Sequence, residues 1–153
     1  VAANRAIGYQ NDVVYFISED LKRFKQLTTG HTVIMGRKTF YSLPKGALPN
    51  RRNIVLSRTE TNFPGCDVYT SLDEALRYIG VDEKVFVIGG ASLYKEALAI
   101  AHHLFLTEID AIPPKADVFF PIYNDGTWTI ASHEDHSAID GMPAYSFVNY
   151  IRK

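Results

Sequence analysis

A continuous apolar run followed by two glycines occupies the middle of the chain, Val85-Phe86-Val87-Ile88-Gly89-Gly90-Ala91-Ser92. An uninterrupted apolar run is typical of a strand buried on both faces, as the strands of a parallel sheet are. The glycines let the backbone approach a ligand closely, and the helix that follows offers free N–H groups to a phosphate. A glycine pair at a strand-to-helix turn also serves packing alone, so both interpretations stay open at this point.

Short apolar or β-branched runs alternate with amphipathic segments on both sides of this junction. Strands are expected at Thr32 to Met35, Asn53 to Leu56, Asp67 to Tyr69, Lys84 to Ile88 and Leu104 to Ile109. Helices are expected at Glu19 to Leu27 with Ser18 as N-cap, at Lys38 to Ser42, after the capping box Ser71-Leu72-Asp73-Glu74, and at Ser92 to Ala99. The segments Thr127 to His133 and Ala144 to Ile151 predict a final antiparallel hairpin. The pattern favours a single α/β domain over residues 1–153.

Composition narrows the class of protein. The chain has 153 residues, 46% of them hydrophobic, and a formal net charge of −1, which suits one folded domain. Cys66 is the only cysteine, so no internal disulfide can form and a reducing, cytoplasmic location is expected. No apolar run approaches the roughly 18 residues of a membrane span, so no membrane partner is expected.

Basic residues are concentrated between positions 21 and 58, a segment without Asp or Glu. Its nine cations are Lys22, Arg23, Lys25, Arg37, Lys38, Lys45, Arg51, Arg52 and Arg58. This segregation indicates an anionic ligand, although not nucleic acid, because few aromatic residues accompany the cations and the whole chain is not basic. If the strands before them are neighbours, Arg37, Lys38, Ser57 and Arg58 converge at one sheet edge and suit a dianionic phosphate such as the 2′-phosphate of NADP. Solvated surface cations are the alternative.

Asp20 is the candidate catalytic carboxylate. Its place in the first turn of a helix is also explained by the helix dipole alone. Because Leu21 and Phe24 lie on its side of the helix, Asp20 can instead border an apolar pocket, where a carboxylate binds a heterocycle and assists proton transfer. No metal site is expected at His133 and His136, since residues three apart in a strand point to different faces.

Ordered segments along nearly the whole chain resemble dihydrofolate reductases of the bacterial chromosomal type. They are Ala6-Ile7-Gly8 with Asn11, Asp20-Leu21 with Phe24, Val33 to Thr39, Leu48-Pro49 with Arg51 and Asn53, Val87 to Gly90, Leu106-Thr107 with Ile109, and Asp117 with Phe119-Phe120-Pro121. The resemblance implies an eight-stranded, mainly parallel sheet with an antiparallel C-terminal strand and four flanking helices. It also implies NADPH-dependent reduction of 7,8-dihydrofolate to tetrahydrofolate for one-carbon metabolism, by hydride transfer to pterin C6 and protonation at N5. The same resemblance implies dihydrofolate as the substrate and antifolate compounds as inhibitors. A monomer is expected, because a small chain with a complete site needs no partner subunit.

The resemblance also assigns roles to individual residues. Asp20 is expected to bind the pterin and promote protonation of N5, with Thr107 hydrogen-bonded to it, and Arg51 to bind the α-carboxylate of the glutamate tail. The implied substrate-binding residues are Ala2, Asp20, Leu21, Phe24, Leu43, Leu48, Arg51, Ile88, Tyr94 and Thr107. The implied NADPH-binding residues are Ile7, Gly8, Asn11, Gly36, Arg37, Lys38, Thr39, Leu56, Ser57, Arg58, Ile88, Gly89, Gly90, Ala91, Ser92, Leu93 and Tyr94. The Gly89-Gly90 peptide bond is expected to be cis.

Two departures from the family pattern concern the N-terminal part. Where the family usually has Leu-Pro-Trp, this chain has Val13-Val14-Tyr15, and Tyr15 is expected to supply a hydroxyl in place of the indole N–H. The first strand and its turn, Val1 to Arg5, are shorter than usual, and the loop from Gly8 to Ile17 is expected to cover the site in contact with Asp117. Two alternatives are an NADPH-binding relative with weak or no reductase activity and a pyrimidine reductase of flavin synthesis. Asp20 and Arg51 argue against the second.

Overall fold

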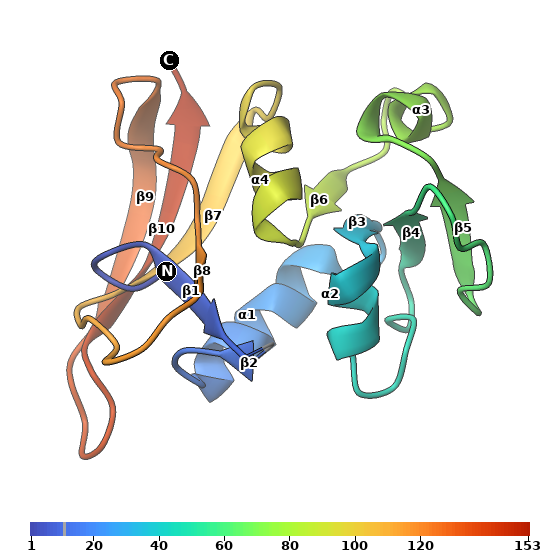
Figure 1. Cartoon of the computed structure of the whole chain (residues 1–153). Coiled ribbons are helices and arrows are strands. Elements are labelled where there is room, and N and C mark those ends of the chain that lie inside the picture. The colour runs from blue at the N-terminus through green and yellow to red at the C-terminus, as the bar shows by residue number, and fades with distance from the viewer. Residues whose placement is uncertain (11) are drawn as a thin grey trace. The chain divides into compact units, whose positions relative to one another are not determined.

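A computed structural model of the chain describes residues 1–10 and 12–153, which form two compact units (Figure 1). The first unit comprises Val1–Ile17 and Leu98–Lys153, and the second comprises Ser18–Ala97. Asn11, an expected cofactor contact, lies outside the described residues.

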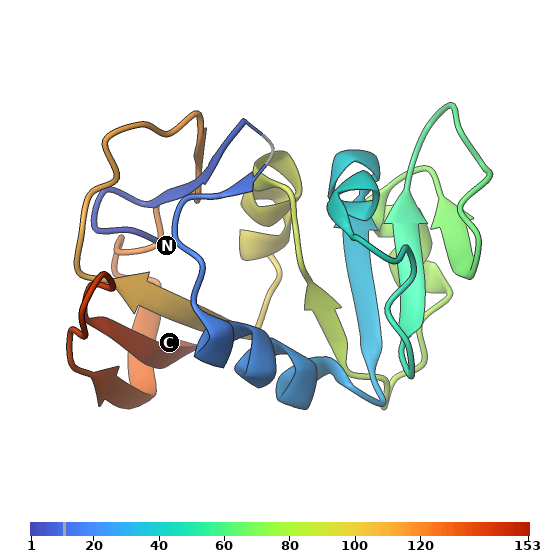
Figure 2. The ribbon, with the colours of Figure 1, turned by 90° about the horizontal axis from the view of Figure 1, so that it is seen from below.

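The second unit is built on a four-stranded parallel sheet in the order β5-β4-β3-β6 (Figure 2). Its strands are β3 (Thr32–Gly36), β4 (Arg52–Leu56), β5 (Cys66–Tyr69) and β6 (Val85–Val87). Each overlaps the strand expected from sequence, and the parallel arrangement predicted from the apolar runs is confirmed.

Helices α1 (Ser18–Thr28), α2 (Arg37–Ser42), α3 (Leu72–Arg77) and α4 (Ala91–Leu98) belong to this unit. Successive residues of a strand point to opposite faces of the sheet, so β3 and β4 supply two hydrophobic clusters. Ile34 and Ile54 pack with residues of α3 and α4, namely Leu72, Ala75, Leu93 and Ala97. Val33, Met35 and Val55 pack on the other face with Phe40 of α2 and with Phe63. Burial on both faces explains why the centre of each strand, Val33 to Met35 and Ile54 to Val55, is apolar.

Helix starts differ in detail from the sequence pattern. The Ser71 hydroxyl caps α3 by accepting from the Glu74 N–H at 3.1 Å, as the capping box predicts. The Glu74 carboxylate, however, accepts from the N–H of Thr70 at 3.0 Å, one residue before the cap. Helix α1 begins at Ser18 itself, so the expectation that Ser18 flanks the helix as its N-cap is wrong.

The first unit is antiparallel. Strands β1 (Ala6–Tyr9), β2 (Asp12–Val13) and β8 (Val118–Phe119) form one sheet in the order β2-β1-β8. Strands β7 (His103–Ile109), β9 (Trp128–His136) and β10 (Tyr145–Arg152) form another in the order β7-β10-β9, which confirms the expected C-terminal hairpin. Ile17, Ile109 and Tyr145 form a buried cluster in this unit.

The expected fold, an α/β protein with a parallel sheet, four helices and antiparallel C-terminal strands, is confirmed over residues 1–10 and 12–153, and the strands differ from expectation in two details. The described residues form ten strands and not eight, because β2 and β8 are separate two-residue pairings with β1. The segment Val1 to Arg5, expected to hold the first strand and its turn, contains no strand, and the first strand is Ala6–Tyr9. Val1 and Ala3 do form backbone hydrogen bonds with Ile109 and Ala111, at 2.8 and 2.9 Å, before a tight turn at Arg5, whose φ is +67°.

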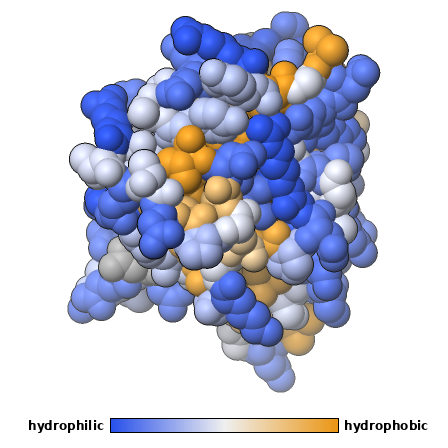
Figure 3. Space-filling view, turned by 90° about the vertical axis from the view of Figure 1, so that its right-hand side faces the viewer, coloured by the Kyte–Doolittle hydropathy of each residue, from blue (hydrophilic) through white to orange (hydrophobic). Residues whose placement is uncertain are grey.

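The surface on the side of the edge strand β5 is mainly hydrophilic, with a limited hydrophobic area (Figure 3). A polar surface at a sheet edge disfavours pairing with strands of other molecules. None of the described helices has the length and apolar character needed to span a membrane.

Candidate active site

The carboxyl ends of three parallel strands meet at one edge of the second unit's sheet. Strand β3 lies between β4 and β6, and Gly36, its last residue, pairs with Leu56, the last residue of β4. The residues that follow these strands are Arg37, Lys38 and Thr39 after β3, Ser57 and Arg58 after β4, and Gly89, Gly90 and Ala91 after β6. The convergence that the sequence predicts for strands lying side by side is confirmed.

Two glycine backbones come into direct contact at this edge. The Gly36 N–H donates to the Gly89 carbonyl at 2.8 Å, and the Gly89-Gly90 peptide bond is cis, as expected. Gly89 has a φ of +138°, and a Cβ on it would lie 2.9 Å from the Thr39 Oγ1 atom. Only glycine fits here, because any side chain would enter the space between the strand end and α2.

Tyr94 connects this glycine junction to Asp20. Its hydroxyl oxygen is 3.7 Å from the position that a Cβ on Gly89 would take, and its N–H donates to the Gly90 carbonyl at 2.9 Å. Burial, and secondly the negative charge of Asp20, raises the pKa of Tyr94 to about 12. The Tyr94 hydroxyl therefore keeps its proton at neutral pH, close to both the Asp20 carboxylate and the Gly89-Gly90 turn.

The cationic part of the edge contains an acidic residue that the sequence reasoning did not single out. Arg37 forms an ion pair with Glu60, with 2.9 Å between Nη1 and Oε1. The Ser57 hydroxyl, expected to face the cofactor, accepts a hydrogen bond from the Glu60 N–H at 3.1 Å. Glu60 lies two residues beyond the basic segment, and only the bend of the loop after β4 brings it back to Arg37.

Arg51 is held against the expected substrate-binding helix. Its guanidinium carbon lies 6.0 Å from the centre of the Phe24 ring, and its Nη1 donates to the Thr28 hydroxyl at 3.1 Å. Partial burial lowers the pKa of Arg51 from its usual value, yet an arginine stays charged at neutral pH. Thr28, one helical turn after Phe24, was not predicted as a site residue and here orients the guanidinium.

A buried amide shapes the loop that carries Arg51. The Asn53 side chain accepts from the Leu48 N–H at 2.9 Å and donates to the Leu48 and Arg51 carbonyls at 2.8 and 3.1 Å. Leu48, Leu43 and Ile88, three expected substrate contacts, pack against the hydrophobic cluster that contains Phe40. Asn53 thereby fixes the backbone on both sides of Pro49.

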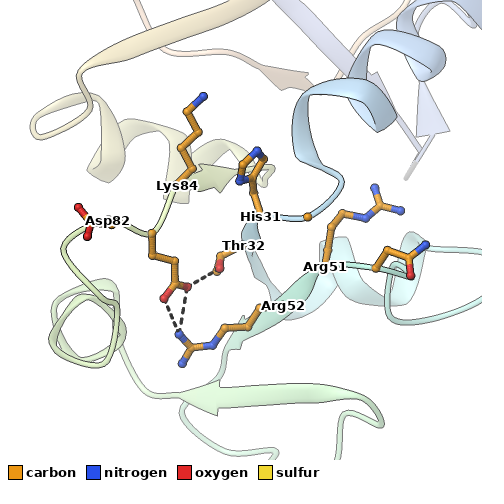
Figure 4. Close-up of a pocket in the computed structure, with 9 residues that line it drawn as sticks. His31, Thr32, Arg51, Arg52, Asp82 and Lys84 are labelled. Atoms are coloured by element: carbon orange, nitrogen blue, oxygen red, sulfur yellow. Dashed lines mark hydrogen bonds and ion pairs between the residues drawn. The ribbon is translucent and has the colours of Figure 1, made fainter.

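Arg52 has a different environment from Arg51. Its guanidinium donates to Asp67 at 2.9 Å and forms an ion pair with Glu83 at 3.1 Å. Figure 4 shows Arg51 and Arg52 pointing in different directions at a pocket of about 490 Å³. This pocket lies at the amino ends of β3, β4 and β6, opposite the glycine junction, and the Arg52, Glu83 and Thr32 side chains are tied together in it. It is therefore distinct from the glycine junction, although Arg51 is among the residues that line it.

Leu21, Leu56, Ser92 and Leu93 lie in the second unit, where the Leu21 side chain is exposed, and other expected residues lie in the first unit. Ala2 and Thr107 are buried, Ile7 and Gly8 lie in β1, and Tyr15 packs against the cluster of Ile17, Ile109 and Tyr145. The Asp117 carboxylate accepts from the Gln10 N–H at 3.0 Å, so Asp117 does contact the loop that starts at Gly8. The hydrogen bond expected between Thr107 and Asp20 would join the two units and stays a prediction.

A parallel sheet with glycines and cations at its carboxyl edge defines an α/β protein of the kind that binds phosphorylated ligands at that edge. The family model for dihydrofolate reductase matches residues 1–152 of this chain. The chain belongs to the dihydrofolate reductase family, and the pyrimidine reductase alternative falls away.

Relatives with curated names agree with this assignment. The chain is 40% identical to dihydrofolate reductase of Bacillus subtilis over 153 residues, covering 99% of this chain and 90% of the relative. It is 38% identical to dihydrofolate reductase of Neisseria meningitidis serogroup A over 152 residues, covering 99% and 93%. A solved structure of dihydrofolate reductase from Enterococcus faecalis complexed with NADP(H) and RAB-propyl is similar with a TM-score of 0.88, at 29% identity, covering 99% of this chain and 92% of that one.

Replacing Gly89 by alanine tests the glycine junction. The added Cβ would press on Thr39, so we expect Gly89→Ala to weaken NADPH binding by about tenfold or more, because small displacements in a binding site have large effects. The matched control is Gly126→Ala, whose φ is also positive, at +90°, but where a Cβ meets nothing within 4 Å. Titration of both variants with NADPH gives the comparison, and equal affinities in the two would contradict the role assigned to Gly89.

Proposed function

We propose that this member of the dihydrofolate reductase family reduces 7,8-dihydrofolate with NADPH, with Asp20 as its catalytic carboxylate and the Gly89-Gly90 turn as part of its cofactor site. The observation that carries this proposal is the position of Tyr94. Tyr94 lies against the glycine turn and within the electrostatic influence of Asp20, inside one compact unit. This position of Tyr94 supports a site in which Asp20 would bind the pterin and the Gly89-Gly90 turn would contact the nicotinamide, so that hydride transfer could take place between the two ligands.

The residues at the carboxyl edge fit NADPH. Backbone atoms of Gly36 and Gly89 approach each other without side chains between them, which leaves main-chain groups to contact a ligand. Arg37, Lys38 and Arg58 are exposed at the same edge and would hold the phosphates, with the 2′-phosphate closest to Arg37 and Arg58. Thr39, beside Gly89, would contact the turn that carries the nicotinamide.

Bound NADPH supplies the hydride that reaches pterin C6. The protein would bind and orient the two ligands and promote protonation of the pterin. The Asp20 carboxylate would accept hydrogen bonds from the amino group and ring N–H of the pterin, and so fix the ring's orientation. The same carboxylate would promote delivery of a proton to N5. The protonated Tyr94 hydroxyl would lie beside the reacting rings without adding charge.

The loop that contains Arg51 would bind the glutamate tail of the substrate. A guanidinium matches a carboxylate with two parallel hydrogen bonds, so Arg51 would bind the α-carboxylate of the glutamate tail. Phe24, Leu43 and Leu48 would line the path of the pterin and benzoyl rings and exclude water from it. Arg52 forms ion pairs with Asp67 and Glu83, so it stabilises the sheet and would not bind the substrate.

The remaining parts of the proposal rest on the first unit and on composition. Contact of Asp117 with Gln10 supports a covering role for the loop from Gly8 to Ile17, in which Tyr15 would supply a hydroxyl to the site. Antifolate inhibitors would bind in place of dihydrofolate, since Asp20 would accept hydrogen bonds from any diaminated heterocycle of similar shape. We also propose a monomeric, cytoplasmic enzyme, supported by the presence of one cysteine and by a set of site residues supplied by a single chain.

Asp20→Asn tests the catalytic carboxylate. The substitution keeps the shape but removes the charge and the proton assistance, so we expect kcat near neutral pH to fall by about a hundredfold or more while NADPH binding is retained. Glu19→Gln is the matched control, because Glu19 is the preceding carboxylate of the same helix and pairs with Lys22 at 3.0 Å. Steady-state kinetics and NADPH titration of both variants decide the point, and unchanged turnover in Asp20→Asn would remove Asp20 from the mechanism.

Arg51→Leu tests the contact with the glutamate tail. Loss of a charge-assisted hydrogen-bonded pair should raise KM for dihydrofolate by about ten- to a hundredfold. The KM for a dihydropterin without the tail should change far less, which makes the ratio of the two an internal control for misfolding. Equal effects on both substrates would show that Arg51 acts on the fold of the loop and not on the carboxylate.

A further inference from the structure

Glu60 is held beside the expected phosphate-binding arginine by residues of two elements. Arg37 and Tyr41 are four residues apart in α2, so their side chains lie on one face of that helix. Arg37 pairs with one carboxylate oxygen of Glu60 at 2.9 Å, and the Tyr41 hydroxyl donates to the other. The carboxylate therefore has defined partners at the cationic edge.

The loop after β4 fixes this position. The Ser57 hydroxyl accepts from the Glu60 N–H at 3.1 Å, which bends the chain back toward α2 within four residues of the strand end. Hydrogen bonds from Tyr41 and then Arg37 hold the pKa of Glu60 below its usual value, so its carboxylate is charged at neutral pH. One negative charge thus lies among the cations Arg37, Lys38 and Arg58.

We propose that Glu60 sets cofactor specificity by competing with the 2′-phosphate of NADPH for Arg37, so that the enzyme prefers NADPH over NADH less strongly than its cations alone would allow. This inference rests on the proposed function, in which Arg37 belongs to the 2′-phosphate site. The two cofactors differ only at one ribose, where NADPH carries a 2′-phosphate and NADH a 2′-hydroxyl, so a charge that acts on the phosphate changes NADPH binding far more than NADH binding.

The direction of the effect follows from charge. A dianionic phosphate at Arg37 meets the Glu60 carboxylate as a like charge, and Arg37 must share or give up its ion pair to bind it. The side chains of Arg37 and Glu60 are 44% and 42% exposed, so water and salt screen the repulsion and keep it moderate. A carboxylate that merely oriented Arg37 would have the opposite effect, since its removal would weaken NADPH binding.

Glu60→Gln is the variant that separates these roles. Glutamine keeps the size of the side chain and removes the charge, so we expect NADPH to bind about three- to tenfold more tightly, with NADH unchanged. In steady state the KM for NADPH should fall while kcat stays constant. The dissociation constants of 2′,5′-ADP and 5′-AMP, which differ only by the 2′-phosphate, should show the same difference, which separates the effect of the phosphate from that of the nicotinamide.

Two further variants act as controls. Tyr41→Phe removes a hydrogen bond to Glu60 but leaves its charge at Arg37, so the NADPH to NADH preference should stay near that of the parent chain. Asp82→Asn removes an equal charge at the opposite end of the same sheet and should also leave the preference unchanged. An unchanged or reduced preference in Glu60→Gln would overturn the inference, whereas a parent chain that binds neither cofactor would overturn the proposed function itself.

Discussion

The contact between the backbones of Gly36 and Gly89 is the constraint on which the proposed site depends. Strand β6 ends beside β3 without side chains between the two glycines, and α2 and α4 start directly after them. The start of α2 positions Arg37 and Thr39, and the start of α4 positions Tyr94. A larger residue at Gly89 would separate the strand end from Thr39, so the ligand-binding edge and the packing of the sheet depend on the same atoms.

The ion pairs of the second unit's sheet have different roles at its two ends. At the amino ends of the strands, Arg52 bonds to Asp67 and Glu83 and thereby links β4 to its neighbour β5 and to the residues before β6. At the carboxyl ends, the pair of Arg37 and Glu60 is exposed and can be rearranged when an anion binds. Arg51 has hydroxyl and carbonyl partners instead of a carboxylate, which leaves its charge for a substrate. One basic segment of the sequence therefore supplies a structural cation and, in the proposed function, a substrate ligand and a cofactor ligand.

The sequence predicted most of the second unit because its strands obey one rule. Each is a short apolar run ending in a glycine or a polar turn, and the convergence of Arg37 and Arg58 follows from parallel neighbours. It did not predict Glu60, Thr28 or Asn53, since these act through loop bends and side-chain hydrogen bonds that carry no periodic signal. The N-terminal part was predicted worst, because Val1 and Ala3 bond to the end of β7 and its continuation without forming a regular strand, and the two-residue strands β2 and β8 are too short to show a pattern.

The most direct test of the account is NADPH oxidation, followed by absorbance, with the purified protein in the presence and absence of dihydrofolate. The account predicts rapid oxidation that requires dihydrofolate and yields tetrahydrofolate in equal amount. Tight NADPH binding without dihydrofolate-dependent oxidation would contradict it. That result would identify the chain as a cofactor-binding relative in which the Val13-Val14-Tyr15 segment prevents the reaction.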